Sequence, residues 1–345
     1  MTTYLDEVAG DEAAALALYE WSARTSAAAF VVVGHLEVLL RNALDSCLRE
    51  YYREESCGIP WFLMPNVGGT NVCEAINLVR ERLRPQGKET RDQVIAGMSF
   101  GFWAGLLGPK YEDLWRNCLH RAFPHGSGRR SQISAALERI RRFRNRLAHH
   151  DSMIKVDVPF EIRLVVQVAG HISSAAGQWL SKSHAEAMAT YRQRPHVPFD
   201  TVVVPAKAAW PLYEDCRAYV CQAGRAFRPF DRMAFYVGRE IKAEVPGVLH
   251  RRDNVEWTPE EAARLARSGD RCDRKVAKVI AATRAEGWSD GRYQVFLLTQ
   301  PGDPKHRSLT TAIAHNAVGK GSAFVQRQRY VSLHALETAN TTSDL

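Results

Sequence analysis

Apolar residues recur at helical spacing through most of the first 194 residues. Residues 10–53 are rich in Ala, Leu, Glu and Arg, and apolar side chains stand three or four positions apart, so they predict one long helix. Proline and glycine at 58–70 break the pattern. Further amphipathic segments predict helices at 71–83, 90–108, 111–123, 131–150 and 158–183. Asn71 and Ser131 are the expected N-caps of two of them.

The pattern changes at residues 192–211, where four prolines interrupt it. Beyond them, aromatic and β-branched residues predict strands at 232–238, 239–245, 254–258, 293–300 and 324–333. Helical patterns lie at 258–287, where Thr258 and Glu261 match a capping box, and in a shorter form at 306–318. The expected organisation is an all-α helical bundle at 1–194, a linker at 195–210 and a smaller α+β domain at 211–345.

Composition and charge narrow the class of protein. Hydrophobic residues make up 46% and charged residues 24%, which is typical of a globular chain. No long uninterrupted apolar run and no basic leader stand out, so we expect no membrane segment and a cytoplasmic location. The net charge of +8 favours a polyanionic partner such as nucleic acid, although a basic surface without a specific role is an equal alternative.

Cysteine usage argues against a metal site. The chain has seven cysteines, an odd number, and no CxxC pair occurs. The closest pair, Cys216 and Cys221, has the wrong spacing for a zinc knuckle. We therefore expect reduced, structural thiols, with no metal and no cofactor.

One stretch is exceptionally basic. Within "RIRRFRNRLAHHDSM" (139–153), five arginines precede two adjacent histidines and an aspartate. Arg144 and His149 in it are separated by four residues, and Asn145 follows the arginine. This R-x4-H pattern resembles the R-x4-6-H motif of HEPN-domain ribonucleases. "HLEVLLRNALD", "MSFGFWAGLLG" and "YEDLW" upstream look like the Abi-like (abortive infection) branch of that superfamily.

The resemblance covers about residues 10–190 and carries expectations about fold and function. It implies a HEPN-like helical bundle and a metal-independent endoribonuclease that serves as an anti-phage toxin. It also implies a homodimer in which each protomer gives one Arg and one His to a composite site. An antitoxin or a phage-derived trigger would then be a further partner. Asp151 departs from the relatives, which often carry glutamate there.

The residue types suit that chemistry on physical grounds. RNA carries its own nucleophile, the 2′-hydroxyl. Histidine can move protons near neutral pH, and arginine grips phosphate oxygens with a fixed charge. The expected products are a 2′,3′-cyclic phosphate and a 5′-hydroxyl. On an ideal helix Arg144 and His149 stand about 140° apart. Either the helix ends near His149, or a second chain completes the site.

Each candidate catalytic residue has a bland alternative. Arg144 is expected to bind the phosphate, or else to be an ordinary surface or salt-bridged arginine. His149 is expected to move protons, or else to sit at a helix C-terminus that favours its charge. His150 is the reserve histidine, and Asn145 either orients the ligand or bonds to its own backbone.

The remaining arginines of the stretch and three neighbours have supporting roles. Arg141, Arg142 and Arg146 are expected to contact RNA phosphates or to be plain solvated charges. Glu37 and Arg41 form an i,i+4 pair or line the site from the first long helix. Asp151 pairs with a histidine or ends the helix.

Residues 211–345 carry no catalytic signature. The Arg-aromatic stretch "GRAFRPFDRMAFYVG" (224–238) suits nucleic acid, yet core packing is the favoured interpretation. "AVGKGSA" (317–323) lacks the spacing of a phosphate-binding loop. Our hypothesis for this half is a sensing or targeting module. For the whole chain, the alternatives to a nuclease are a non-catalytic RNA- or nucleotide-binding module and a purely structural helical dimer.

Overall fold

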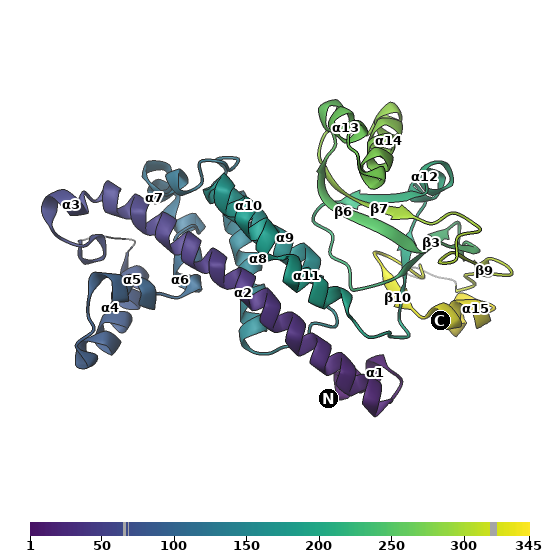
Figure 1. The fold of residues 1–345 in the computed structure, drawn as a ribbon, viewed down its shortest axis with the longest axis horizontal. Helices are drawn as coiled ribbons and strands as arrows, with labels where there is room; N and C mark the ends of the chain where they lie inside the picture. Colours follow the sequence, from purple (N-terminus) through teal and green to yellow (C-terminus); the bar gives the residue numbers. More distant parts are fainter. Residues whose placement is uncertain (65–66, 68, 318–322) are drawn as a thin grey trace. The chain divides into compact units, whose positions relative to one another are not determined.

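Two compact units make up the chain. The computed structural model describes residues 1–64, 67, 69–317 and 323–345. The helical unit comprises Tyr19–Met153 and Val158–Arg194. The α+β unit comprises Met1–Leu18, Ile154–Asp157 and Pro195–Leu345. The predicted order, a helical region followed by an α+β region, is confirmed at this coarse level (Figure 1).

The helical unit is built around the predicted long helix, α2 (Glu12–Tyr51), which begins in the α+β unit's first segment. Shorter α-helices follow it along the chain: α3 (Glu54–Cys57), α4 (Thr70–Leu83), α5 (Arg91–Gly97), α6 (Phe100–Gly105), α7 (Glu112–Asn117), α8 (Arg130–Ala148), α9 (Val158–Ile172), α10 (Ser174–Ser183) and α11 (Ala185–Arg192). Short 3₁₀ turns link some of them: η1 (Trp61–Leu63), η2 (Arg84–Gln86), η3 (Pro109–Tyr111) and η4 (Leu119–Ala122).

Local capping explains why the segment 90–108 forms two helices rather than one. Thr90 caps α5, where its side chain accepts from the Gln93 N–H at 3.3 Å. Ser99 caps α6 in the same way, accepting from the Phe102 N–H at 3.2 Å. A second cap in mid-segment offers the backbone an alternative to continuing the first helix. The expected caps Asn71 and Ser131 are wrong, because α4 and α8 begin before them.

Helix α2 is both long and apolar. An 18-residue window within it has a mean hydropathy of 1.5, so by length and composition it passes the test for a membrane span, which corrects the expectation that no segment comes close. A core helix passes the same test. The inward face of α2 is fully buried in the described structure, at Trp21, Leu36, Leu40 and Leu44.

A buried ion cluster ties α5 to the C-terminal part of α2. The Arg91 guanidinium donates to Asp45 at 2.8 Å and to Glu54. The Trp61 indole N–H donates to Asp45 at 2.7 Å. Burial opposes the charge on Arg91, but the hydrogen bonds to Glu54 and Asp45 outweigh it and raise the Arg91 pKa. Asp45, the last residue of the segment 35–45, therefore has a structural role.

The α+β unit contains two principal sheets. The first has the strand order β10-β1-β3-β4-β9, and the second has the order β2-β7-β6. Their bounds are β1 (Thr201–Pro205), β2 (Ala218–Gln222), β3 (Arg232–Val237), β4 (Glu240–Ile241), β6 (Val248–Glu256), β7 (Arg292–Leu298), β9 (Ile313–Ala314) and β10 (Arg329–Val331). A small pair, β5 (Glu244–Val245) and β8 (Arg307–Ser308), lies beside them. A bridge from Arg232 to Gly247 links β3 to the start of β6, so the sheet curls.

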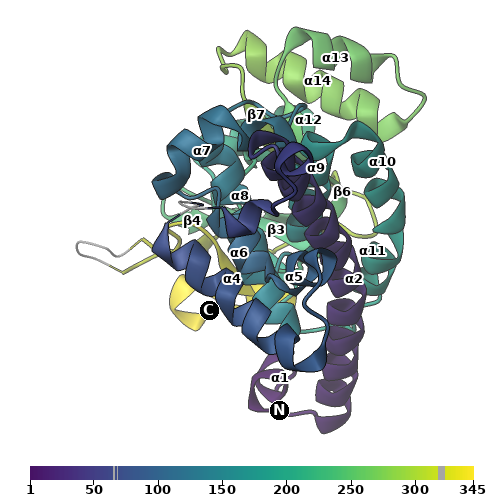
Figure 2. The ribbon, with the colours of Figure 1, turned by 90° about the vertical axis from the view of Figure 1, so that its left-hand side faces the viewer.

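The α-helices of this unit are α1 (Thr2–Glu7), α12 (Ala209–Cys216), α13 (Pro259–Ala266), α14 (Arg271–Ala285) and α15 (Leu333–Thr338). Apolar side chains of the last four belong to the clusters packed on the sheets. Helices α13 and α14 lie side by side in both ribbon views (Figures 1 and 2). Thr258 caps α13 by accepting from the Glu261 N–H at 3.2 Å, which confirms the predicted helix start.

Period-two alternation in the strands produces three apolar layers. On β7, Val295 and Leu297 face α13 and α14, whereas Phe296 and Leu298 face the other sheet. Phe227 joins the layer between the sheets and is 1% exposed. The aromatic residues of the stretch 224–238 therefore fill core, as the favoured interpretation held.

Two expectations for the second half are wrong. The segment 195–210, expected as a linker, contains β1, which pairs with β3 and β10 and is buried on both faces. The shorter helix expected at 306–318 instead forms the small strands β8 and β9. In both cases pairing with distant strands overrides the local pattern. Most of the 317–323 glycine-lysine segment lies outside the described residues.

Candidate functional site

Helix α8 carries the R-x4-H motif on its outward side. Apolar side chains at helical spacing bury its inner face, namely Ile133, Leu137, Ile140, Phe143 and Leu147. The positions between them are left for polar side chains. This periodicity is why the arginines of the stretch reach the surface or its edge.

A Schellman turn ends α8 at the two histidines. The last helical residue is Ala148, and His149 is the C-cap. The His150 N–H donates to the Leu147 carbonyl at 3.2 Å, and the Asp151 N–H donates to the Arg146 carbonyl at 3.0 Å. Both histidine side chains are exposed. Of the two geometric alternatives, a helix end near His149 is thus observed.

His150 occupies the position of this turn that usually belongs to glycine. Its φ is +54°, in the left-handed region. A side chain there costs energy, although histidine tolerates the region better than most residues. Non-glycine residues held in this region cluster at functional sites. The backbone conformation thus favours His150 as a candidate site residue, and the sequence pattern alone does not reveal this.

Arg144 is half-buried beside α2. Its Nε lies 3.7 Å from Glu37 Oε2, and its guanidinium lies 5.9 Å from the Phe30 ring centroid. Within the described structure, Arg144 Nε is buried and makes no hydrogen bond. The ion pair is longer than a hydrogen bond, so the guanidinium keeps donor capacity for another anion.

The expected i,i+4 pair on α2 does not form. Glu37 faces Arg144, and Arg41 instead approaches the side-chain oxygen of its neighbour Asn42 at 3.5 Å. Glu37 therefore lies beside Arg144, as its second interpretation requires, whereas a role in the site stays a prediction. Asp151 ends the helix through its backbone N–H, as one of its two interpretations held.

Asn145 contributes to the helix end through its carbonyl, which accepts from the His149 N–H at 2.9 Å. Its side chain is half-exposed. Arg146 is exposed and follows directly. In the described part of the chain, neither side chain has a hydrogen-bonding or ionic partner, so both are available to a ligand.

Arg141 and Arg142 meet a carboxylate that the sequence interpretation overlooked. Arg141 makes two hydrogen bonds to Glu138, at 2.8 and 2.9 Å, and Arg142 lies 3.4 Å from the same side chain. The hydrogen bond from Arg141 lowers the pKa of Glu138, which stays ionised. These contacts weaken the case for both arginines as phosphate contacts. The i,i+3 and i,i+4 spacing from Glu138 was the available signal.

Arg139, the first of the five arginines, is structural. It donates to Glu161 of α9 at 2.8 Å and stacks over the Phe160 ring at 4.0 Å. The contact fixes α8 against α9. Of the five arginines of this stretch, Arg146 has no ionic contact within the described structure, and Arg144 has one long contact, to Glu37.

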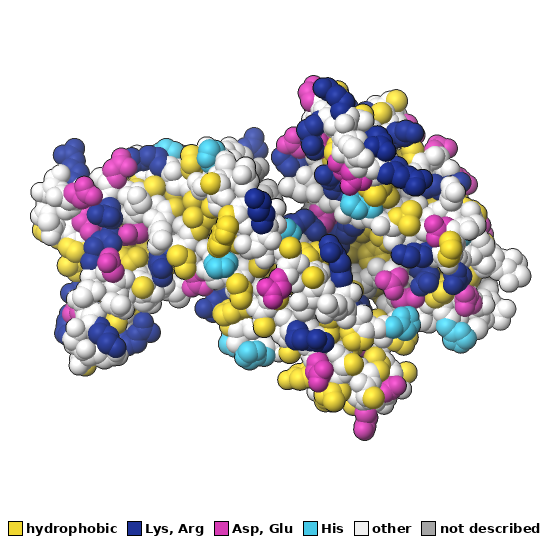
Figure 3. Space-filling model, viewed as in Figure 1, with side chains coloured by type: hydrophobic (Ala, Val, Ile, Leu, Met, Phe, Trp, Pro, Cys, Tyr) yellow, Lys and Arg dark blue, Asp and Glu magenta, His cyan; other side chains and the backbone are white. Residues whose placement is uncertain are grey.

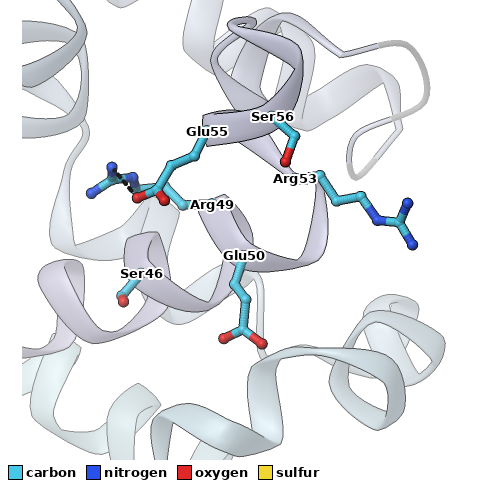
Figure 4. Close-up of a pocket in the computed structure, with 6 residues that line it drawn as sticks. All are labelled: Ser46, Arg49, Glu50, Arg53, Glu55 and Ser56. Carbon is cyan, nitrogen blue, oxygen red and sulfur yellow. Dashed lines mark hydrogen bonds and ion pairs between the residues drawn. The ribbon is translucent and has the colours of Figure 1, made fainter.

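Two cavities open elsewhere on the helical unit. One, of about 300 Å³, lies near the C-terminal end of α2, and the positive and negative charges of its lining are equal in number. Figure 4 shows its lining residues, which are Ser46, Arg49, Glu50, Arg53, Glu55 and Ser56. Arg49 and Glu55 pair across it at 3.1 Å, whereas the Arg53 side chain points away. A shallower hollow of about 530 Å³ is lined by Trp115, Arg116, His120, Arg121, Phe123, Pro124, Gly126 and Gly128. Neither includes the R-x4-H residues.

The cysteines do not form a reactive centre. All are free thiols in the described structure. Burial raises the pKa of Cys118 and of Cys221 to about 12, which keeps both protonated and unreactive. Among the described residues, no cluster of His, Cys, Asp and Glu has a geometry suited to a metal ion.

Comparison of the chain with protein-family models, curated proteins and solved structures found no match.

Proposed function

We propose that the chain is a metal-independent endoribonuclease of the HEPN, Abi-like type, with Arg144 and His149 as its catalytic residues. One observation carries the proposal. Helix α8 ends so that two histidines stand exposed, while Arg144, one turn earlier, is held beside Glu37 with hydrogen-bonding capacity to spare. A phosphate oxygen and a mobile proton need those two kinds of group.

The reaction follows from the chemistry of RNA. The 2′-oxygen attacks phosphorus and the bond to the 5′-oxygen breaks, leaving a 2′,3′-cyclic phosphate and a 5′-hydroxyl. One histidine accepts the 2′-hydroxyl proton, and a second protonates the departing oxygen. The Arg144 guanidinium stabilises the charge on the phosphorane. His150, or His149 of a second copy, is the other histidine.

The proposal includes a homodimer in the cytoplasm with a composite site. Its support is the resemblance of the R-x4-H stretch to HEPN ribonucleases, in which each protomer gives one Arg and one His. The end of α8 at Ala148 removes the geometric requirement for a second chain. A two-fold pairing would bring two such pairs together. In this proposal the enzyme is an abortive-infection toxin, and the α+β unit senses a trigger or targets the RNA.

The test is RNA cleavage in EDTA. We expect Arg144→Ala and His149→Ala each to abolish cleavage while the variant protein keeps the wild-type fold. The reason is that each substitution removes a group that would contact the reacting phosphate. Arg142→Ala is the matched control and should retain activity, since the Arg142 side chain is directed to Glu138 at 3.4 Å and has no part in the proposed reaction. Binding without cleavage of any RNA, unchanged in both variants, would instead identify a non-catalytic binding module. Partial recovery on mixing the two inactive variants would support the shared site.

A further inference from the structure

A group of exposed cations lies on α14, in the α+β unit. Arg271, Arg274, Lys275 and Lys278 occupy one helical face, at positions i, i+3, i+4 and i+7. All of them are exposed. We call these residues the α14 basic face. Lys and Arg side chains gather over α13 and α14 in the space-filling view (Figure 3).

No carboxylate within the described structure pairs with this face. Arg274 donates to the Ser268 and Gly269 carbonyls at 2.9 and 2.8 Å, and these contacts leave its charge in place. The nearby Asp273 is occupied, because it pairs with Arg252 of β6 and its pKa stays low. Arg141 and Arg142 of α8 differ from the α14 basic face, because both contact the Glu138 carboxylate.

Such an arrangement works against helix stability. Every i,i+3 and i,i+4 neighbour within the α14 basic face is another cation, and like charges at that spacing destabilise a helix. An ordinary solvated helix mixes acids with bases, as Glu261 and Arg264 do on α13 at 2.6 Å. A polyanionic ligand would remove the repulsion, which makes the face suited to binding one.

We infer that the α14 basic face binds the phosphate backbone of RNA. Its four cations lie along about 10 Å of helix, a spacing that suits successive phosphates. A membrane surface is a poorer fit, because no large apolar side chain is exposed on α13 or α14 among the described residues. The choice of RNA rather than another polyanion rests on the proposed function. The α+β unit is thereby a substrate-binding module.

The experiment measures binding of the full chain to fluorescein-labelled single-stranded RNA in EDTA across a salt series. The test variant is the double substitution Lys275→Gln and Lys278→Gln. We expect roughly fivefold weaker binding at low salt. The slope of log affinity against log salt should also be shallower by about 1.4, since each phosphate contact to a single strand contributes about 0.7. The melting temperature should hold or rise, because repulsion is relieved.

The matched control is the double substitution Arg141→Gln and Arg142→Gln, which also removes two neighbouring cations, but from α8. Because both guanidiniums already contact Glu138, the salt slope should change less than in the α14 variant. An unchanged slope in the α14 variant, or an equal loss in the α8 control, would overturn the inference. The inference would also fail if the α14 substitutions weakened binding to phosphatidylserine vesicles but left binding to RNA unchanged.

Cleavage separates this inference from the proposed function. Arg144→Ala should bind RNA with the wild-type salt slope and fail to cut it. The α14 variant should cut at saturating RNA and show a raised KM. If no variant or wild-type protein cuts RNA but the α14 substitutions still weaken binding, the nuclease proposal fails and the binding face stands.

Discussion

The carboxylate that each α8 arginine meets decides what that arginine can do. Arg139 and Arg141 are held by bidentate contacts to Glu161 and Glu138, whereas Arg144 has one loose contact to Glu37 at 3.7 Å. A bidentate guanidinium–carboxylate pair leaves few donors, and a single long contact leaves most of them. At the residue scale, the candidate site is therefore narrower than the basic stretch.

His150 offers a test in which stability and activity separate. Because its φ is +54°, His150→Gly should leave the free energy of unfolding unchanged or raise it by about 0.5 kcal/mol. His150→Val should lower that free energy by about 1–2 kcal/mol. If the side chain takes part in proton transfer, cleavage by the glycine variant should fall by roughly a hundredfold or more. Urea denaturation and initial cleavage rates measure the two effects. Full activity in a stable His150→Gly protein would remove His150 from the site.

Helices of this protein differ in whether their cationic side chains have a carboxylate partner nearby. Helix α8 holds Glu138 within reach of two of its arginines, and the α4–η2 junction uses one carboxylate for two cations. Helix α14 has no such balance on its basic face among the described residues. The amphipathic pattern of α8 and α14 is alike, so hydrophobic periodicity does not distinguish a neutralised helix from a ligand-binding one.

The α4–η2 junction gives a pH prediction. Hydrogen bonds from Arg84 and then Arg80 lower the pKa of Glu89 from 4.5 to about 2. A depressed folded pKa means that the pair stabilises the fold above pH 4.5 and loses that contribution as the pH falls through about 2. An NMR titration of the Glu89 carboxyl should give a midpoint near 2. Arg84→Gln should move the midpoint upward. A wild-type midpoint near 4.5 would contradict the hydrogen bonds from Arg84 and Arg80 to Glu89.

On the scale of the whole molecule, the chain leaves the candidate site directly into the α+β unit. Met153 still belongs to the helical unit, where its N–H donates to Ser22 Oγ at 2.9 Å, and Ile154–Asp157 belong to the α+β unit. The buried Asp157 carboxylate accepts from the Phe227 N–H at 2.8 Å and from Arg251 at 2.7 Å. The α+β unit therefore includes residues that begin five positions after His149 in the chain.

Removing the Arg251 cation should show how much this anchor contributes. Arg251→Ala leaves a buried carboxylate without its bidentate partner, so the free energy of unfolding should fall by about 3–5 kcal/mol. Arg251→Lys retains the charge and should lose less. Guanidinium denaturation of the full chain measures both. An alanine variant as stable as wild type would mean that Asp157 is not an anchor.

The sequence by itself determined the features that depend on short-range pattern. Apolar spacing predicted α2 and α8, aromatic and β-branched content predicted β3 and β7, and Thr258 marked the start of α13. Hydrogen bonds within a helix and the facing of side chains on one element are local, so they can be read from neighbours along the chain.

Only the tertiary structure decided which features act together. It placed β1 in a sheet, brought Glu37 of α2 to Arg144 and left the α14 basic face without a carboxylate among the described residues. These outcomes depend on residues far apart in sequence, and partner choice is set by packing rather than by local preference. The most basic run in the sequence is largely neutralised by such partners, while a less conspicuous one keeps its charge.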